Sequence, residues 1–310
     1  MPARIATLTV NPAVDMATVA PSVRPGHKIR TFDERYDAGG GGINVARVVG
    51  ELGGQALALF ASGGVTGRFV EEFLTAARVP WQTVGIAGAC RISVTVYDQS
   101  TGQEYRFVPR GPEVAPSEWA TMLERLRQVE ADWVVASGSL APGMPTDFYA
   151  QAARIVAARG ARFVLDTSGP ALTAALGAGI FLLKPSLSEL EAIVGRPVDD
   201  LPSQLAQAKR LVEDGAARMV ALTLGDAGAI LATADSVIHS PAIAVRQKTG
   251  VGAGDSFLAG LVFGLSERQP LDEALQLGLV CGAAAVQGVG TAAVRRADVD
   301  ALLARLRSDA

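Results

Sequence analysis

The sequence predicts an α/β protein whose central sheet is mostly parallel and covered by helices on both faces. From about Trp133 onward, short apolar runs alternate with helical patterns such as "TDFYAQAARIVAARG" and "SQLAQAKRLVEDG". Continuous apolar strands that alternate with helices indicate parallel pairing, because both faces of such a sheet are buried. The runs are "WVVASGS" (133–139), "RFVLDTSG" (162–169), "IFLLKPS" (180–186) and "RMVALTLG" (218–225).

The residues at the ends of the predicted strands indicate where a site would lie. The N-terminal "ARIATLTV" and the later "ALALFASGG" (56–64) are expected to join the same sheet. The four strands from Trp133 onward end in "SGS", "DTSG", "KPS" and "TLG". Ligands of open α/β sheets bind at the carboxyl ends of the strands, so these residues indicate a binding site. Capping of the helices that follow accounts for part of the same pattern.

Two segments interrupt the alternation of strands and helices. Residues 12–37 are polar and alternating, and residues 89–109 have the pattern of an antiparallel hairpin with a turn at "DQSTGQ". We expect them to form a small β-sheet lid on a single domain that spans residues 1–310. Two ordinary edge hairpins are the alternative. Basic residues on both segments favour the lid: Lys28, Arg30, Arg91 and Arg106.

The composition excludes several classes of function. Hydrophobic residues are 49% of the 310 residues and charged residues 19%, as in globular proteins. The net charge of −3 leaves no basic excess to neutralise phosphates, so no nucleic-acid partner is expected. No apolar run approaches the roughly 20 residues of a membrane span, and no signal peptide precedes the first strand, so we expect a cytoplasmic protein. The two cysteines and two histidines are isolated, which argues against zinc.

Two glycine runs lead directly into helices. They are "YDAGGGGINVARVVGELGG" (36–54) and "TGVGAGDSFLAG" (249–260). A helix N-terminus has unpaired N–H groups and a partial positive charge, and glycine lets an anion approach that backbone closely. The helix after the second run is apolar on nearly every side and is therefore predicted to be buried. A Walker A sequence and a Rossmann GxGxxG after the first strand are both absent.

Asp255 follows the second glycine run, and two interpretations compete. A lone Asp at a helix start usually caps the helix. A carboxylate beside an anion site would repel the anion, however, unless the carboxylate handles a proton. A base beside an anion hole suits phosphoryl transfer, in which backbone N–H groups hold the transferred group.

The motifs "AGGGGINVAR" and "TGVGAGDSFLAG" resemble those of the ribokinase-like carbohydrate kinases of the PfkB family. "TLTVNPAVD", "ASGSLAPG", "LKPSLSEL" and "TLGDAGAI" lie in the family's order, so the resemblance covers essentially the whole chain. It is closest to the phosphosugar kinases, and among them to the bacterial minor-isozyme type of 6-phosphofructokinase. The resemblance implies a ribokinase-like three-layer α/β/α sandwich with a mostly parallel central sheet and a small β-sheet lid. It also implies a homodimer through the lids.

The resemblance implies a role for individual residues. Asp255 matches the general base of the family. The residues that match its anion hole are Gly252, Ala253 and Gly254. Residues that match contacts with the sugar hydroxyls are Asp15, Gly40, Gly41 and Asn44, with Ser139 near the sugar. Asn44 as a plain helix-start residue is the alternative.

Other residues match contacts with phosphate, nucleotide and metal. The candidates for the phosphate already on the substrate are Lys28, Arg30, Arg91 and Arg106, because Arg grips phosphate with two N–H groups. The nucleotide contacts are Lys184, Ser186, Thr223 and Gly225. The metal ligand is Glu189. The family usually has Asn-x-x-Glu after "KP", whereas Ser186 stands here in place of the amide, which puts the affinity for magnesium in question. Glu189 as a simple helix-face acid is the alternative.

We therefore expect an ATP-dependent kinase that phosphorylates the 1-hydroxyl of fructose 6-phosphate. ATP would be the co-substrate, with Mg²⁺ as the cofactor and a monovalent cation as a further candidate. Fructose 1-phosphate and tagatose 6-phosphate are alternative substrates. A phosphosugar-binding sensor without catalysis is the alternative from another class, and a nucleoside or ribose kinase is the third. Four basic lid residues disfavour the last of these, since a neutral acceptor needs no phosphate clamp.

Overall fold

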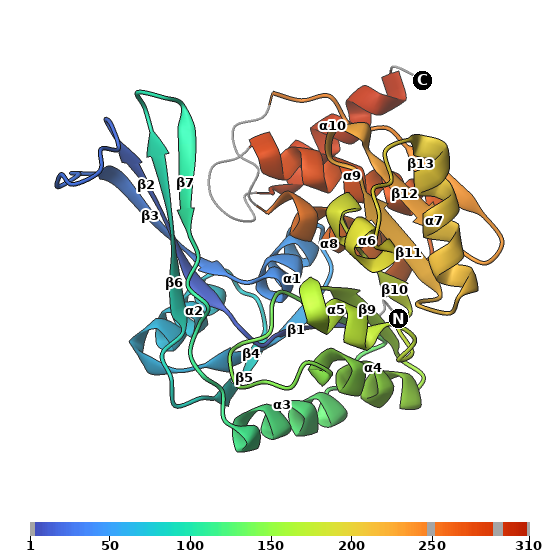
Figure 1. Ribbon diagram of the computed structural model, residues 1–310, viewed down its shortest axis with the longest axis horizontal. Helices are drawn as coiled ribbons and strands as arrows, with labels where there is room; N and C mark the ends of the chain where they lie inside the picture. The colour runs from blue at the N-terminus through green and yellow to red at the C-terminus, as the bar shows by residue number, and fades with distance from the viewer. Residues whose placement is uncertain (1–3, 247–251, 288–293, 309–310) are drawn as a thin grey trace.

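The computed structural model describes residues 4–246, 252–287 and 294–308, and it contains a large and a small β-sheet (Figure 1). In these residues the large sheet has the strand order β13-β12-β11-β10-β9-β8-β1-β4-β5. Its strands are β1 (Ile5–Thr9), β4 (Ala56–Ser62), β5 (Trp81–Gly85), β8 (Trp133–Ser137), β9 (Arg162–Asp166), β10 (Leu182–Leu183), β11 (Met219–Thr223), β12 (Ala229–Ala232) and β13 (Val237–Ser240).

The predicted α/β class is confirmed. Neighbouring strands from β5 to β11 pair in parallel, and only β12 and β13 join the edge antiparallel. The runs predicted at 133–139, 162–169, 180–186 and 218–225 contain β8, β9, β10 and β11. The two earlier predicted strands are β1 and β4.

Helices cover both faces of the large sheet (Figure 1). They are α1 (Gly41–Glu51), α2 (Gly64–Ala76), α3 (Pro116–Gln128), α4 (Phe148–Ala158), α5 (Gly169–Ala175), α6 (Leu187–Val194), α7 (Leu201–Glu213), α8 (Ala253–Ser266), α9 (Leu271–Gln287) and α10 (Arg296–Ser308), with a 3-10 turn at Gly225–Ala227. Side chains along β8 alternate between two cores: Trp133 and Val135 enter one, and Val134 and Ala136 enter the other. A strand that is buried on both faces has the continuous apolar sequence seen here.

Helix α8 is buried, as its apolar sequence predicts. Phe257, Leu258 and Leu261 are each at most 4% exposed. Gly260 allows α9 to approach closely, because a Cβ at that position would lie 2.7 Å from the carbonyl oxygen of Leu277. This packing fixes the direction of α8 and therefore the place of its N-terminus.

The small sheet has the strand order β3-β2-β6-β7. Its strands are β2 (Ala13–Ala20), β3 (Phe32–Gly39), β6 (Arg91–Asp98) and β7 (Gln103–Phe107). The two predicted segments therefore share one sheet, joined by parallel pairing of β2 with β6. The predicted turn of the hairpin is closed by Asp98, whose Oδ1 accepts hydrogen bonds from the N–H and the hydroxyl of Ser100. The sheet extends away from the larger body (Figure 1).

No helix in the described residues combines the length and the apolar character that crossing a bilayer needs.

Candidate active site

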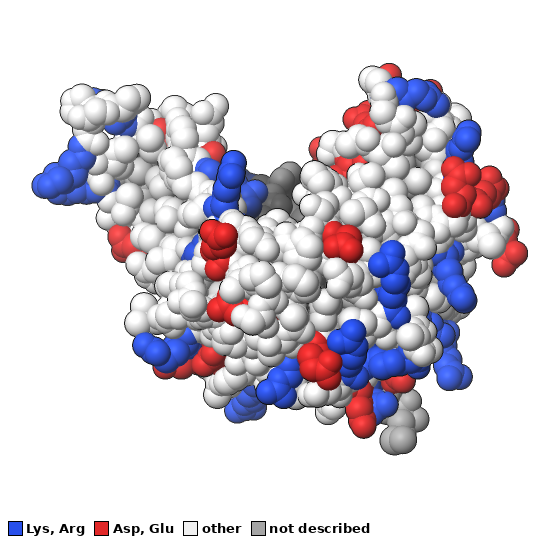
Figure 2. Space-filling view, turned by 60° about the horizontal axis from the view of Figure 1, so that its bottom comes forward, with Lys and Arg blue, Asp and Glu red and all other residues white. Residues whose placement is uncertain are grey.

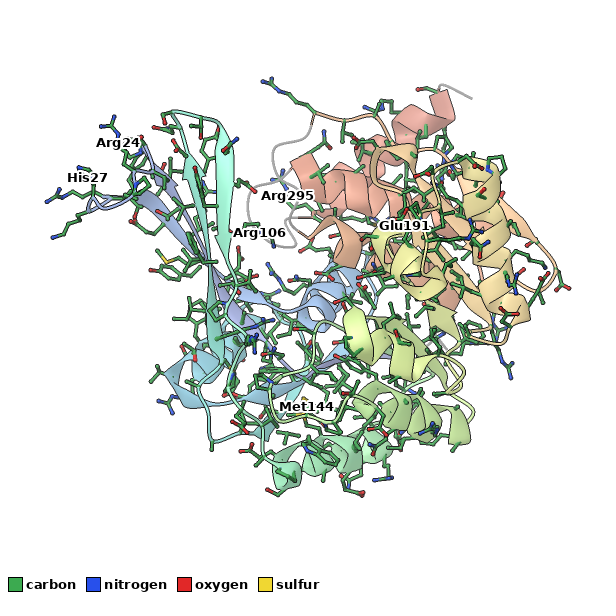
Figure 3. The ribbon with its side chains drawn as sticks, viewed as in Figure 1. Arg24, His27, Arg106, Met144, Glu191 and Arg295 are labelled. Atoms are coloured by element: carbon green, nitrogen blue, oxygen red, sulfur yellow. The ribbon has the colours of Figure 1, made fainter. Side chains whose placement is uncertain are left out.

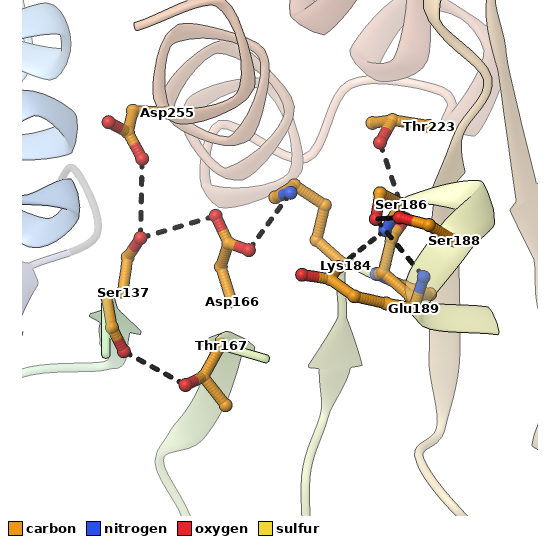
Figure 4. A network of polar contacts seen from close by, with 11 residues as sticks. Ser137, Asp166, Thr167, Lys184, Ser186, Ser188, Glu189, Thr223 and Asp255 are labelled. Carbon is orange, nitrogen blue, oxygen red and sulfur yellow. Dashed lines mark hydrogen bonds and ion pairs between the residues drawn. The ribbon is translucent and has the colours of Figure 1, made fainter. Parts of the chain in front are cut away.

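The site lies where three strands of the large sheet end and two helices begin. Ser137, Asp166 and Lys184 stand at or just after the carboxyl ends of β8, β9 and β10, and α8 brings Asp255 to the same place (Figure 4). Figure 2 shows the molecule hollowed between the small sheet and the larger body, with basic side chains beside the hollow. Strand ends and a helix N-terminus together form the ligand site typical of open α/β sheets.

Asp255 is not the cap of its helix. Helix α8 begins at Ala253, its cap is Gly252 with a φ of 79°, and Asp255 is therefore the third helical residue. Its carboxylate instead accepts two hydrogen bonds from other elements. Asn44 Nδ2 of α1 donates to Oδ2 at 2.9 Å, and Ser137 Oγ donates to Oδ1 at 3.4 Å. The side chain is thus held by tertiary contacts, as a catalytic group requires.

The surroundings of Asp255 favour its protonated form. Protein encloses the carboxyl, although part of its surface stays open, and the pKa of Asp255 is raised to about 6, mainly by this burial. The neighbouring Asp166 carboxylate contributes to the rise in pKa, whereas the hydrogen bond from Asn44 and the charge of Lys184 oppose it. A carboxyl with a pKa near neutral pH is suited to accept a proton.

The first glycine run lies directly beside Asp255. A Cβ on Gly41 would overlap Ser137 Oγ and lie 2.9 Å from Asp255 Oδ1. Gly40 has a φ of 121°, in the region that favours glycine. Bare backbone therefore lies directly against the carboxylate. Gly250, which belongs to the second run, lies outside the described residues.

Asn44 is the fourth residue of α1 and is 3% exposed. Its amide N–H group donates to Asp255, while its Oδ1 is buried without a hydrogen-bond partner in the described part of the chain. An orphaned buried acceptor is costly, and a bound hydroxyl would satisfy it. The geometry therefore favours the predicted sugar contact over a plain helix-start residue.

The sequence did not identify two residues of this network, Ser137 and Asp166. Asp166 Oδ1 pairs with Lys184 Nζ at 3.0 Å, and Asp166 Oδ2 accepts from Ser137 Oγ at 3.3 Å. Both residues belong to the strand ends "SGS" and "DTSG". The only signal for them was their place at these ends, and helix capping explains the same signal.

Lys184 lies at the start of α8. A Cβ on Gly254 would be 3.7 Å from Lys184 Nζ, so the ammonium group stands beside the helix N-terminus. Burial lowers the pKa of Lys184, but the carboxylates of Asp166, Glu189 and Asp255 outweigh this and leave it raised. Lys184 therefore stays charged next to backbone N–H groups, which suits an anion.

Ser186 and Glu189 form a capping box at the start of α6. The backbone N–H of Ser186 donates to Glu189 Oε2 at 2.8 Å, and Ser186 Oγ accepts from the backbone N–H of Glu189 at 3.3 Å. One carboxylate oxygen of Glu189 is thus engaged, and within the described residues the other accepts no hydrogen bond. Thr223 is bridged to Ser186, and Gly225 opens the 3-10 turn with a φ of 58°. The predicted nucleotide residues therefore lie side by side.

One face of the small sheet is polar. Paired residues share a face, and Asp15 is aligned with Asp37 and Ser93, while Ala17 is aligned with Arg35 and Thr95. Arg106 on β7 pairs with Thr95 and belongs to the same face. Burial raises the pKa of Asp15, and the charges of Arg91 and Arg106 act against this. The structure therefore brings the predicted residues Asp15, Arg91 and Arg106 together.

Lys28 and Arg30 do not lie beside that group. Both are exposed in the loop between β2 and β3. Arg24 and His27 mark this loop at the outer end of the small sheet, whereas Arg106 lies toward the body (Figure 3). The four predicted phosphate residues thus fall into two separate pairs within one chain.

The chain is similar to known proteins over most of its length. The model of the pfkB family of carbohydrate kinases matches residues 10–297. ATP-dependent 6-phosphofructokinase isozyme 2 of Mycobacterium tuberculosis is 43% identical over 96% of this chain and 88% of its own length. The 1-phosphofructokinase of Bacillus subtilis is 34% identical over 90% of this chain and 91% of its own.

Solved structures of phosphofructokinase-2 from Escherichia coli have the same fold. The complex with fructose-6-phosphate is 34% identical, covers 98% of this chain and 99% of its own, and has a TM-score of 0.92. The complex with potassium covers the same shares at 34% identity, with a TM-score of 0.94.

Proposed function

The chain belongs to the pfkB family of carbohydrate kinases, and on this premise we propose that it is an ATP-dependent 6-phosphofructokinase. It would transfer the γ-phosphoryl group of ATP to the 1-hydroxyl of fructose 6-phosphate. One observation carries the proposal beyond the family: Asp255 is held by Asn44 and Ser137 with its Oδ1 against the bare backbone of Gly41. A protein that only bound sugar would not need a carboxylate of raised pKa at an anion site.

The proposed reaction uses Asp255 as the base. Asp255 accepts the proton of the sugar hydroxyl, whose oxygen attacks the γ-phosphorus, and the bond to the oxygen shared with the β-phosphate breaks. The N–H groups of Gly252, Ala253 and Gly254 open α8 and would hold the transferred group. Lys184 beside them would neutralise phosphate charge. Asp15, Gly40, Asn44 and Ser139 would position the sugar.

Magnesium fits the residues near Lys184. In the described residues no three His, Cys, Asp or Glu side chains gather as a metal cage. Mg²⁺ usually takes one or two carboxylates plus phosphates and waters, so such a cage is not needed. We propose Glu189 as its protein ligand, because one oxygen of that carboxylate is uncommitted. When bound, the ion supplies charge neutralisation on the nucleotide phosphates.

Ser186 in place of the family's Asn fits this scheme. It caps α6 through its own hydroxyl, so the helix that carries Glu189 keeps its cap. A requirement for a monovalent cation is part of the proposal, and the potassium complex of the Escherichia coli protein supports it. A cytoplasmic location is part of it as well.

We further propose that the small sheet is the lid of a single kinase domain and that two lids form a homodimer. The second face of the sheet is apolar: a row of paired residues crosses all four strands, made of Tyr36, Met16, Val94 and Phe107. Tyr36 is 50% exposed and Phe107 is 58% exposed. An exposed apolar face of this extent is typical of a protein interface. Lys28 and Arg30, at the outer end, would then contact phosphate only by reaching a partner's site.

The test is ADP release measured with fructose 6-phosphate, fructose 1-phosphate, tagatose 6-phosphate, ribose and adenosine. The highest kcat/KM is expected for fructose 6-phosphate. Preference for fructose 1-phosphate would instead support the second candidate, which the Bacillus subtilis relative favours. Preference for a sugar without phosphate would overturn the proposal, and no ADP release with any acceptor would support a sensor.

A further inference from the structure

The chain contains only two asparagines, Asn11 and Asn44, among 310 residues. Asparagine is ordinarily a turn residue, yet neither asparagine lies in an exposed turn, for Asn11 is 4% exposed and Asn44 is 3% exposed. Asn44 holds the proposed base. Asn11 follows β1 in "TLTVNPAVD", and the proposed mechanism gives it no role.

The amide of Asn11 has a fixed orientation. Its Nδ2 lies 2.9 Å from the carbonyl oxygen of Arg110, and 3.4 Å from both Ser139 Oγ and the carbonyl oxygen of Leu140. Only an N–H donor can satisfy two carbonyl groups, so Nδ2 must face them. The amide thus connects the segment after β7 with the loop after β8, which are separated by nearly thirty residues of sequence.

Asn11 also contacts Arg91. Arg91 Nη2 donates to the main-chain oxygen of Asn11 at 3.0 Å, and Arg91 Nη1 donates to the carbonyl oxygen of Pro109 at 2.9 Å. Asn11 and Arg91 therefore hold the same return segment, Asn11 through Arg110 and Arg91 through Pro109. These two contacts engage one N–H group on each terminal nitrogen of the planar guanidinium group, and the second N–H group of each nitrogen remains for a ligand.

Stability alone does not explain this arrangement. Asn11 Oδ1 is buried with no hydrogen-bond partner in the described residues. It lies against Gly111, where a Cβ would overlap it and where φ is 99°. A buried acceptor without a partner costs stability, and such costs concentrate at functional sites.

We propose that Asn11 is a positioning residue that sets the distance between Arg91, the phosphate contact, and Ser139, the sugar contact. The inference rests on the proposed function, since it assigns the phosphosugar to these two residues. A phosphosugar presents its phosphate and its hydroxyls at a fixed separation, so the separation of Arg91 and Ser139 determines which phosphosugar fits. Asn11 would thereby contribute to substrate selectivity without touching ATP.

The test compares Asn11→Ala and the isosteric Asn11→Asp with the parent. Both variants remove the N–H donors, and Asn11→Asp does so without leaving a cavity. We expect the KM for fructose 6-phosphate to rise at least tenfold in both, with the KM for ATP within twofold. Selectivity for fructose 6-phosphate over tagatose 6-phosphate should fall at least fivefold. In an Arg91→Ala background, Asn11→Ala should raise the KM less than threefold, because its effect passes through Arg91.

The matched control is Gln204→Ala, which removes another buried amide that donates to a main-chain oxygen, that of Val198, at 3.1 Å. It should lower the melting temperature and leave both KM values unchanged. Unchanged KM and selectivity in Asn11→Asp, or effects that add fully to those of Arg91→Ala, would overturn the inference alone. A parent without any phosphosugar-dependent ADP release would overturn the proposed function and this inference together.

Discussion

Asp255 shows how a single residue can oppose stability and support function. Its pKa of about 6 lies above the ordinary 3.8, so folding favours the protonated form. This favourable contribution is present at acid pH and is lost as the pH rises from 3.8 through 6. Two pKa units correspond to about 3 kcal/mol, an upper estimate for a group that retains some open surface. The native state at pH 8 therefore carries an unfavourable charge.

Asp255→Asn should lower turnover by several orders of magnitude and stabilise the protein. Removing a general base costs about 10²- to 10⁴-fold in kcat, while the amide keeps the shape of the side chain. Because the unfavourable charge is gone, the melting temperature at pH 8 should rise, and the difference from the parent should shrink near pH 4. Steady-state kinetics and calorimetry at both pH values measure this. A kcat within tenfold of the parent would contradict the assignment as base.

The pH dependence of the rate tests the same carboxyl in the parent. The base must be ionised to accept a proton, so kcat/KM for the sugar should fall as the pH drops below about 6. A second carboxyl, that of Asp15, also has a raised pKa, mainly from burial, and would affect the KM for the sugar rather than kcat. A kcat/KM that stays constant down to pH 4.5 would rule out a base with this pKa.

Arg91→Ala should weaken the phosphosugar far more than ATP. A charge-assisted contact with phosphate contributes about 1.5–3 kcal/mol, or roughly ten- to a hundredfold in KM. Arg154→Ala, which removes an exposed arginine on α4, is the control and should change the KM by less than about threefold. An equal loss with fructose 6-phosphate and with free fructose would show that Arg91 does not contact the phosphate.

The residues that sequence alone identified are those that stand inside a distinctive motif. Asp255 and Lys184 fall in "GAGD" and "KPS", and the structure brings them to one place. Ser137 and Asn11 also lie in quoted motifs, "ASGSLAPG" and "TLTVNPAVD", and Asp166 lies in the strand end "DTSG", but polar residues at these places cannot be told from caps in one sequence. Their roles depend on contacts across 29 to 128 residues of chain, which no local pattern encodes.

At the scale of elements, one short sequence fits two different motifs. Ser186-Leu187-Ser188-Glu189 fits the capping pattern S-x-x-E as well as the family's metal motif. The structure shows the capping box, and the metal role of Glu189 stays a prediction. The two roles are compatible, because the cap occupies Oε2 and leaves Oε1.

Glu189→Gln separates these two roles. The glutamine oxygen can still accept from the N–H of Ser186, so α6 keeps its cap while the charge is lost. The Mg²⁺ concentration for half-maximal rate should rise about tenfold, with the KM for the sugar nearly unchanged. Glu191→Gln on the same helix is the matched control, since Glu191 Oε1 also accepts a backbone N–H, that of Val198. An identical magnesium response in both variants would place the metal ligand elsewhere.

At the scale of the whole molecule, the sequence predicted both sheets but not how the small one is assembled. Alternation and a turn identify the strands of residues 12–37 and 89–109. The parallel pairing of β2 with β6 joins residues that are nearly 80 positions apart, and it decides which side chains share a face. Only with this register do Asp15 and Arg106 fall on one face and Tyr36 and Phe107 on the other.

This division between the faces is the physical reason to expect a dimer. A four-stranded sheet that extends from the body cannot bury both of its faces against its own chain. The polar face carries the residues that we propose for the sugar and its phosphate, whereas the other exposes Tyr36, Ile92 and Phe107. Covering apolar surface stabilises association by about 25 cal/mol per Å² before the costs of binding. A second copy of the same face offers a complementary apolar partner and closes the assembly by two-fold symmetry.

Phe107→Glu should therefore convert a dimer into a monomer. The substitution puts a charge at the β7 end of the apolar row, next to Val94, where the dimer would bury it without a partner. Light scattering at micromolar concentration should show a dimer for the parent and a monomer for this variant. The control is Leu201→Glu at the start of α7. It introduces the same charge at another exposed apolar residue, which lies on the body, and should leave the dimer intact.

The monomeric variant also tests the outer loop. Because Lys28 and Arg30 of a monomer could reach no partner, the Phe107→Glu variant should lose affinity for fructose 6-phosphate and keep its affinity for ATP. A parent that is monomeric and fully active would contradict both the dimer and the role of the outer loop.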